Sequence, residues 1–271
     1  MKYLQGIPET LYKYRVWDNK FHKRLITENE VFLASPASLN DPFDASLPFR
    51  YDPSVMTKEN IFIKLLQQGR LIWPNASEEE LHQLAYTEQQ SGKFEDDTYW
   101  KDQHENAKAE LHKTFGLLSL TTHPDNLLMW AHYANCHRGF CVGISSKILY
   151  DVVGGSIGPV NYIEDFPLMP LFPEEGQDVI HMVKMLNSKS PHWRYEDEFR
   201  LTRSQAANMA FTLPTEAITE VILGCNMSTS DRAEIIGVVD SKLPSAKIFE
   251  SVTSLEKFRL NINSANLIKA Q

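Results

Sequence analysis

Residues 115–145, FGLLSLTTHPDNLLMWAHYANCHRGFCVGIS, decide the fold class of this chain. Two short apolar runs, residues 115–120 and 139–145, are bounded by turn signals and predict buried strands. The segment between them, residues 125–134, predicts a short helix. The neighbouring helices and strands are interleaved irregularly, without the βα repeat of a doubly wound sheet. We therefore expect an α+β fold with a mixed, largely antiparallel sheet and packed helices.

The N-terminal part of the chain carries a strand, a structured loop and a helical block. Residues 10–15 are β-prone, and residues 30–35 form a second short apolar run. In the loop ASLNDPFD, Asn and Asp side chains favour hydrogen bonds to their own backbone, and proline fixes φ. Residues 56–114 have helical periodicity, with a capping box at Ser77 and Glu80. We expect this block to be a helical insertion or lid within a single domain, residues 1–271.

The C-terminal part predicts two more helices and several short strands. These are strands at 160–163, near 194–203, at 218–223, near 248–252 and near 257–262, and helices near 178–187 and at 228–239.

Composition limits the possible functions and the compartment. The chain has 271 residues and a formal net charge of −8, which argues against sequence-independent nucleic-acid binding, because such binding relies on clustered Lys and Arg. We expect no membrane segment, since no window reaches the 18 or more apolar residues that a span requires. The N-terminus resembles neither a signal peptide nor a transit sequence. Three cysteines, an odd count, fit a reducing compartment, so we predict a soluble, cytoplasmic protein.

The segment KSPHWRYEDEFRLTR, residues 189–203, is the leading candidate site. On a regular strand, Glu196, Glu198 and Arg200 would share one face with Arg194, and Asp197 would point to the other. Two adjacent carboxylates beside guanidinium groups suit the binding of a hydroxyl, a cation or a developing positive charge. The alternative is a solvated sheet face with weak surface ion pairs.

A second candidate region gathers aromatic and basic groups before a predicted buried strand. Trp130 and Tyr133 suit a stacking pocket for a base or a nicotinamide ring, although a core tryptophan is the simpler interpretation. A zinc site is disfavoured and no metal is expected, because known zinc spacings are absent from the set His132, Cys136, His137 and Cys141. Asn40, in the ASLNDPFD loop, is a third candidate, because loops often carry function.

Four ordered motifs resemble a family of bacterial proteins catalogued as a domain of unknown function (DUF2971). They are LYKYR near the start, FLASPASLNDPFD, LSLTTHPDNLLMWAHYANCHRGFCVGI and KSPHWRYEDEFR. The resemblance covers most of the chain and implies no established activity.

The chain also distantly resembles the ADP-ribosyltransferase superfamily, whose members cleave NAD at the nicotinamide–ribose bond. That resemblance implies a split sheet, with Tyr14 and Arg15 on an early strand near NAD, and Ser119 or Tyr133 on a middle element. It also implies a catalytic Glu198, with Glu196 positioning the acceptor and an arginine, Arg200, near the pyrophosphate. The early pair differs from the superfamily's usual His or lone Arg, and SLTT only approximates its Ser-Thr-Ser motif.

Three hypotheses follow. The first is an ADP-ribosyltransferase or NAD glycohydrolase, in toxin or phage-defence biology, with NAD as substrate and an unidentified macromolecular acceptor. The second is a non-catalytic module that binds a nucleotide or a protein. The third and weakest is a metal-dependent nuclease or phosphoesterase that uses Glu196, Asp197 and Glu198 as ligands.

Overall fold

A single eight-stranded sheet organises the chain in the computed structural model, which describes residues 5–48, 50–174 and 177–265. In spatial order its strands are β12 (Leu260–Ser264), β11 (Lys247–Thr253), β10 (Ile218–Leu223), β4 (Phe140–Ser145), β1 (Thr10–Arg15), β3 (Phe115–Thr121), β8 (Glu198–Ser204) and β5 (Ser156–Pro159). β10 and β11 run parallel, and the other neighbours are antiparallel. This confirms the predicted α+β class with a mixed, largely antiparallel sheet.

Two small sheets lie beside the main one. β2 (Glu30–Leu33) pairs antiparallel with β9 (Met209–Thr212), and β6 (Asn161–Tyr162) pairs parallel with β7 (Ser188–Lys189). The chain leaves β2 through a short 3₁₀ turn, η2 (Pro36–Ser38), which begins where Pro36 fixes φ and the Ser35 side chain caps the backbone of Ala37. This turn leads into the ASLNDPFD loop.

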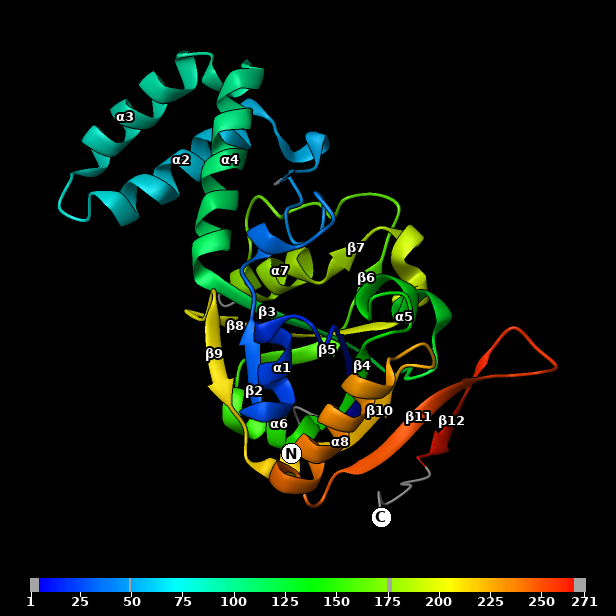
Figure 1. Ribbon diagram of the computed structural model, residues 1–271. Coiled ribbons are helices and arrows are strands. Elements are labelled where there is room, and N and C mark those ends of the chain that lie inside the picture. Colours follow the sequence, from blue (N-terminus) through cyan, green and yellow to red (C-terminus); the bar gives the residue numbers. More distant parts are fainter. Residues whose placement is uncertain (1–4, 49, 175–176, 266–271) are drawn as a thin grey trace.

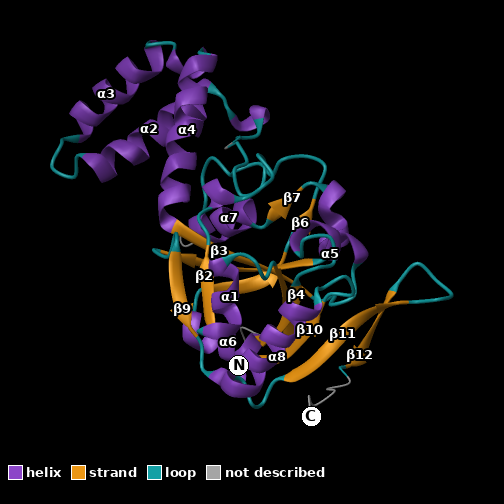
Figure 2. Cartoon of the chain, viewed as in Figure 1, coloured by secondary structure: helices purple, strands orange, loops and turns teal. Residues whose placement is uncertain are grey.

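Apolar side chains cover both faces of the sheet. Helices α1 (Lys20–Thr27), α6 (Ser146–Val153) and α8 (Thr229–Lys242) pack on one face and form the larger core (Figure 2). Helix α5 (Leu127–Tyr133) covers the other face, where Trp130 packs edge-to-face on Tyr14 with ring centroids 5.1 Å apart. Within the described residues, no helix is long and apolar enough to cross a membrane.

Three helices fill the segment predicted as a helical insertion. α2 (Lys58–Ile72), α3 (Glu78–Gln90) and α4 (Asp97–Thr114) form an arm that projects from the sheet (Figure 1). The predicted capping box is confirmed, since the Ser77 side chain accepts from the Glu80 backbone and the Glu80 carboxylate accepts from the Ser77 backbone. The role of this arm as a lid within one domain stays a prediction. A further helix, α7 (Gln177–Leu186), lies between the arm and the sheet (Figure 1).

The main sheet opens between β1 and β3. β1 pairs with β4 along all six of its residues, but it pairs with β3 at one position, Tyr12 opposite Thr121. Gly139 permits the close approach on the β4 side, because a Cβ there would lie 2.2 Å from the Arg15 carbonyl oxygen. On the other side of the gap, Leu117 of β3 pairs with Ala34 instead, through two backbone hydrogen bonds of 2.8 and 2.9 Å. The strands therefore separate after Tyr12 and leave room for a cavity.

The predicted strand near residues 194–203 begins later than expected. A 3₁₀ turn, η5 (Pro191–Glu196), replaces its first part, because Pro191 fixes φ and the Ser190 side chain caps the turn at the His192 backbone. Asp197 then adopts a left-handed conformation, with φ 42°, and β8 starts at Glu198. The prediction that residues 194–203 alternate along one regular strand was wrong in its first four positions.

Candidate functional site

A cavity occupies the gap between β1 and β3. It has a volume of about 410 Å³ and adjoins a second cavity of about 530 Å³. Both are lined by side chains from β1, β2, η2 and β3, and six residues border both: Lys13, Arg15, Phe32, Ala34, Ser38 and Leu118. Both volumes lie within the range typical of small-molecule sites. The two cavities therefore lie side by side; we call them the first and the second lobe, and we call the six residues that border both the neck.

Two cations from β1 line this neck. Lys13 and Arg15 are two positions apart on one strand, so their side chains project to the same side. Neither forms an ion pair with a carboxylate among the residues that the structure describes. Burial lowers the pKa of Arg15 to about 10, and burial together with the nearby Arg15 charge lowers the pKa of Lys13. Two crowded, poorly solvated cations without a counter-ion are well suited to bind an anion.

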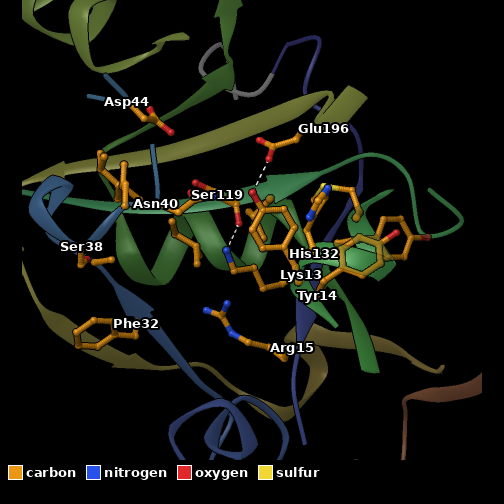
Figure 3. Close-up of a pocket in the computed structure, with 18 of the residues that line it drawn as sticks. Lys13, Tyr14, Arg15, Phe32, Ser38, Asn40, Asp44, Ser119, His132 and Glu196 are labelled. Carbon is orange, nitrogen blue, oxygen red and sulfur yellow. Dashed lines mark hydrogen bonds between the residues drawn. The ribbon is translucent and has the colours of Figure 1, made fainter. Parts of the chain in front are cut away.

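The first lobe ends at a carboxylate held by a tyrosine and a lysine. Glu196, the last residue of η5, accepts a hydrogen bond of 2.6 Å from the Tyr133 hydroxyl and one of 2.5 Å from Lys189 Nζ. The cavity lining includes Glu196 and His132, which are labelled in Figure 3. It also includes Tyr133 and Lys189. Burial raises the pKa of Tyr133, and the Glu196 carboxylate raises it further, so the hydroxyl stays protonated and acts as a donor.

Behind this carboxylate lies a buried ion cluster. Arg200 binds Asp44 at 2.8 and 3.0 Å and Glu198 at 2.8 and 3.0 Å, and it also donates to the Leu186 carbonyl at 2.6 Å. Lys189 lies 3.1 Å from Glu198 and 3.4 Å from Asp44, in addition to its contact with Glu196. All of these charged side chains are at most 5% exposed.

The charges in this cluster control one another's protonation. Burial opposes the ionised form of Glu198, but the Arg200 and Lys189 charges outweigh it and lower the pKa of Glu198 to about 2. Burial likewise opposes the charge on Arg200, and the carboxylates of Glu198 and Asp44 reverse this effect and raise its pKa. Glu198 is therefore ionised at neutral pH. The alternative of a solvated face with weak surface ion pairs is wrong, because this face is buried.

The structure brings several of the predicted site residues to the cavity. Arg15 lines both lobes. The first lobe is also lined by Tyr133 and by four residues that are labelled in Figure 3: Tyr14, Asn40, Ser119 and Glu196. The Tyr14 hydroxyl also donates to the His123 carbonyl at 2.6 Å, which anchors its ring. The Ser119 backbone carbonyl accepts a hydrogen bond of 2.5 Å from Lys13.

Three other predicted residues lie outside the cavity lining. Glu198 and Arg200 belong to the buried ion cluster behind it. Trp130 is fully buried in the core beneath α5, where its indole nitrogen donates to the Pro124 carbonyl at 2.9 Å and its ring stacks on His137. Its position corresponds to the simpler interpretation of a core tryptophan rather than to a stacking pocket.

Among the described residues, no group of three or more His, Cys, Asp or Glu side chains is arranged to hold a metal ion. The residues weighed for zinc lie apart, because Cys136 is exposed in a left-handed turn whereas Cys141 is buried on β4. Asp197 turns to the surface, where it lies 3.1 Å from His123 Nε2 and 2.6 Å from the Thr122 hydroxyl. It therefore does not join Glu196 and Glu198.

Sequence reasoning missed Lys13, Lys189 and Asp44. A signal for Lys13 was present, because its spacing of two from Arg15 on a predicted strand places both on one face. Lys189 and Asp44 gave no such signal, since their roles depend on contacts between β7, the ASLNDPFD loop and β8, which only the tertiary structure determines.

Comparison with known proteins identifies the central part of the chain. Residues 129–201 match the family model described as protein of unknown function (DUF2971). The match confirms the predicted family resemblance over this segment, which contains Tyr133, Lys189, Glu196, Glu198 and Arg200. No curated protein and no solved structure gives a significant match to the chain. The DUF2971 segment thus supplies the carboxylate side of the cavity, whereas the cations of the neck come from β1, outside the matched residues.

Proposed function

We propose that the cavity between β1 and β3 binds NAD and that the protein cleaves its nicotinamide–ribose bond, as an NAD glycohydrolase or an ADP-ribosyltransferase. One observation supports this proposal. Two cations that form no ion pair among the described residues, Lys13 and Arg15, border both lobes. A dinucleotide has the matching form, since its pyrophosphate carries the negative charge at the centre and a nucleoside extends to either side. Guanidinium and ammonium groups bind phosphate oxygens through strong charge-assisted hydrogen bonds.

The lobes differ in chemistry, which gives the ligand a direction. The first contains Glu196, Tyr133 and His132, so a ring that develops positive charge suits it. The second contains Asn19, Phe21 and His22, where an aromatic ring and neutral polar groups suit a nucleobase. We therefore place the nicotinamide ribose in the first lobe and the adenosine in the second.

The bond cleavage that we propose takes place in the first lobe. When the bond between ribose C1′ and the nicotinamide nitrogen breaks, the electron pair moves to the nicotinamide, and the ribose becomes an oxocarbenium-like cation. A fixed carboxylate beside this cation stabilises the transition state, and water or an acceptor nucleophile then adds to C1′. Two carboxylates line the cavity, Asp44 and Glu196. Asp44 is paired with Arg200, so we assign this role to Glu196, which Tyr133 and Lys189 hold in place.

This arrangement divides the roles of the two glutamates. The resemblance to ADP-ribosyltransferases implied a catalytic Glu198, yet Glu198 is fully engaged with Arg200 and Lys189 behind the cavity wall. We assign the catalytic carboxylate to Glu196 and give Glu198 a positioning role through Lys189.

The test is nicotinamide release from NAD by the full chain. We expect release by the wild type, loss of release with retained NAD binding in Glu196→Gln, and loss of binding in Arg15→Ala. Glu256→Gln and Arg259→Ala, at exposed positions on the β11–β12 hairpin, serve as matched controls. Equal release by wild type and Glu196→Gln would overturn the catalytic assignment.

A second candidate function is a non-catalytic nucleotide-binding module. The contact that favours it is the ion pair between Lys189 and Glu196, because the ammonium partly neutralises the carboxylate. This alternative predicts saturable NAD binding that depends on Arg15, with no nicotinamide release. The same experiment therefore separates the two functions.

The setting that we propose is the bacterial cytoplasm, where NAD is available. Its support is the free state of Cys136, Cys141 and Cys225, which suits a reducing compartment. The acceptor that would receive ADP-ribose is not defined by the cavity.

A further inference from the structure

A second, separate cavity lies at the base of the helical arm. It is enclosed by α2, by α4 and by two body segments that contribute Tyr51 and Leu171, and its volume is about 210 Å³. Three residues of α4 line it: Trp100, His104 and Ala107. This cavity has no lining residue in common with the cavity between β1 and β3.

Aromatic rings form much of its wall. Trp100 lies with its ring centroid 6.1 Å from Tyr51, 5.2 Å from Tyr99 and 6.1 Å from Phe94, at interplanar angles of 67°, 72° and 48°. A hydrogen bond of 2.9 Å from Trp100 Nε1 to the Phe94 carbonyl fixes the indole. The Lys93 ammonium lies over the Phe94 and Tyr99 rings, 5.2 and 5.3 Å from their centroids, so we assign the contact with a planar ligand to Trp100 and Tyr51.

One side chain of the cavity lining has a polar atom without a hydrogen-bond partner among the described residues. His104 Nδ1 is buried and forms no hydrogen bond within the described residues. Buried polar atoms in native proteins are nearly always paired, so this orphan atom marks His104, a lining residue, as a side chain whose hydrogen bonding is incomplete within the described residues. Gln68 and Gln103, exposed at the rim, supply amide groups that pair with the donor and acceptor edge of a nucleobase.

We propose that this cavity binds a planar heterocycle of purine size. Trp100 and Tyr51 would stack on its faces, and the His104 imidazole would form a hydrogen bond with one of its ring or amino groups. The volume suits one fused ring system and excludes a complete dinucleotide. The site therefore differs in ligand from the cavity between β1 and β3, and its existence does not rest on the proposed NAD cleavage.

Occupation of the site would couple the arm to the body of the protein. The lining comes from α2 and α4 on the arm and from Tyr51 and Leu171 on the body, so one ligand touches both parts. Such a ligand would favour the arm position that keeps these walls together, because it binds that arrangement better than an open one.

The experiment is isothermal titration of the full chain with adenine. We expect saturable binding, at least tenfold weaker binding in His104→Leu, and loss of binding in Ala107→Leu, whose larger side chain fills the cavity. Arg259→Ala, at an exposed position on the β11–β12 hairpin, is the matched control and should bind adenine as the wild type does. Circular dichroism and thermal melting verify that each variant is folded.

Three outcomes would overturn the proposal. One is a wild-type Kd weaker than about 1 mM. Another is equal adenine affinity in the wild type and in the folded His104→Leu and Ala107→Leu variants. The third is binding that Arg15→Ala removes and Ala107→Leu leaves intact, which would place adenine between β1 and β3.

Discussion

Lys13 donates a hydrogen bond of 2.5 Å to the Ser119 backbone carbonyl, across the gap where β1 and β3 separate. The side chain thereby satisfies an edge carbonyl that a continuous sheet would have paired with β1 backbone. The same ammonium group lines the neck of the cavity beside Arg15. Lys13 therefore bridges the gap between β1 and β3 and also contributes positive charge to the cavity lining.

A first prediction concerns this lysine. Lys13→Met removes one of the two cations at the neck, so we expect NAD to bind about 10- to 100-fold more weakly, as for the loss of one charged hydrogen bond. The salt dependence of binding should also fall, because fewer charges attract the ligand. Titration at two ionic strengths measures both effects, with Arg259→Ala as a control. Unchanged affinity and salt dependence in Lys13→Met would contradict the placement of the pyrophosphate at the neck.

A second prediction concerns the stability of the buried ion cluster. Arg200→Met leaves Glu198 and Asp44 buried without their main partner, and such a loss costs about 3–5 kcal/mol of unfolding free energy. Arg203→Met is the matched control on the same strand, since Arg203 is only part-buried and donates to the Val153 carbonyl. We expect urea denaturation to show a much smaller loss for the control. Similar losses in the two variants would indicate that the cluster contributes no special stability.

A third prediction follows from the lowered pKa of Glu198. Its ordinary pKa is 4.5 and its pKa in the folded protein is about 2, so the folded state binds a proton less readily than the unfolded state does. The stabilisation is therefore present above pH 4.5 and is lost as the pH falls from 4.5 towards 2. This contribution is on the order of 3 kcal/mol.

Comparison of wild type with Glu198→Gln measures this contribution. At pH 7 the variant should be less stable in urea denaturation, and the difference should shrink as the pH falls through this window. A difference that is independent of pH would show that Glu198 acts through packing alone and not through its charge.

Sequence patterns predicted the sheet better than they predicted the site. The period-two and apolar-run signals located β1, β3, β4 and β10 closely, because each of these strands is bounded by turn residues and packs on a core. Helix α6 and strand β9 received no prediction. Strand β9 is short and largely exposed, so its apolar signal is weak.

The site depended on contacts that local patterns do not carry. The sequence pattern singled out Glu196 and Glu198, but their partners Lys189 and Asp44 come from β7 and the ASLNDPFD loop. The period-two assumption also failed at Asp197, where a left-handed residue separates the 3₁₀ turn from β8. Local propensity could not reveal this kink, since it is fixed by Pro191 and by the contacts of Asp197 with His123 and Thr122.

The final prediction concerns His22, in the second lobe. Burial, and after it the charges of Arg15 and Lys13, together lower the pKa of His22 to about 4. Since its ordinary pKa is 6.5, the free protein keeps His22 neutral in the range where the unfolded chain would protonate it. This lowered pKa makes the protein lose stability as the pH falls from 6.5 towards 4, in the absence of an anion.

A pyrophosphate at the neck would offset the part of this effect that comes from charge, because it neutralises the two cations that repel a proton on His22. The pKa of His22 should then rise on binding, so NAD should bind with proton uptake at pH 5 and more tightly there than at pH 7. Titration in two buffers of different ionisation enthalpy measures the uptake, with His22→Asn as the control variant that should show none. Equal uptake in wild type and His22→Asn would assign the proton to another group and separate the second lobe from the bound anion.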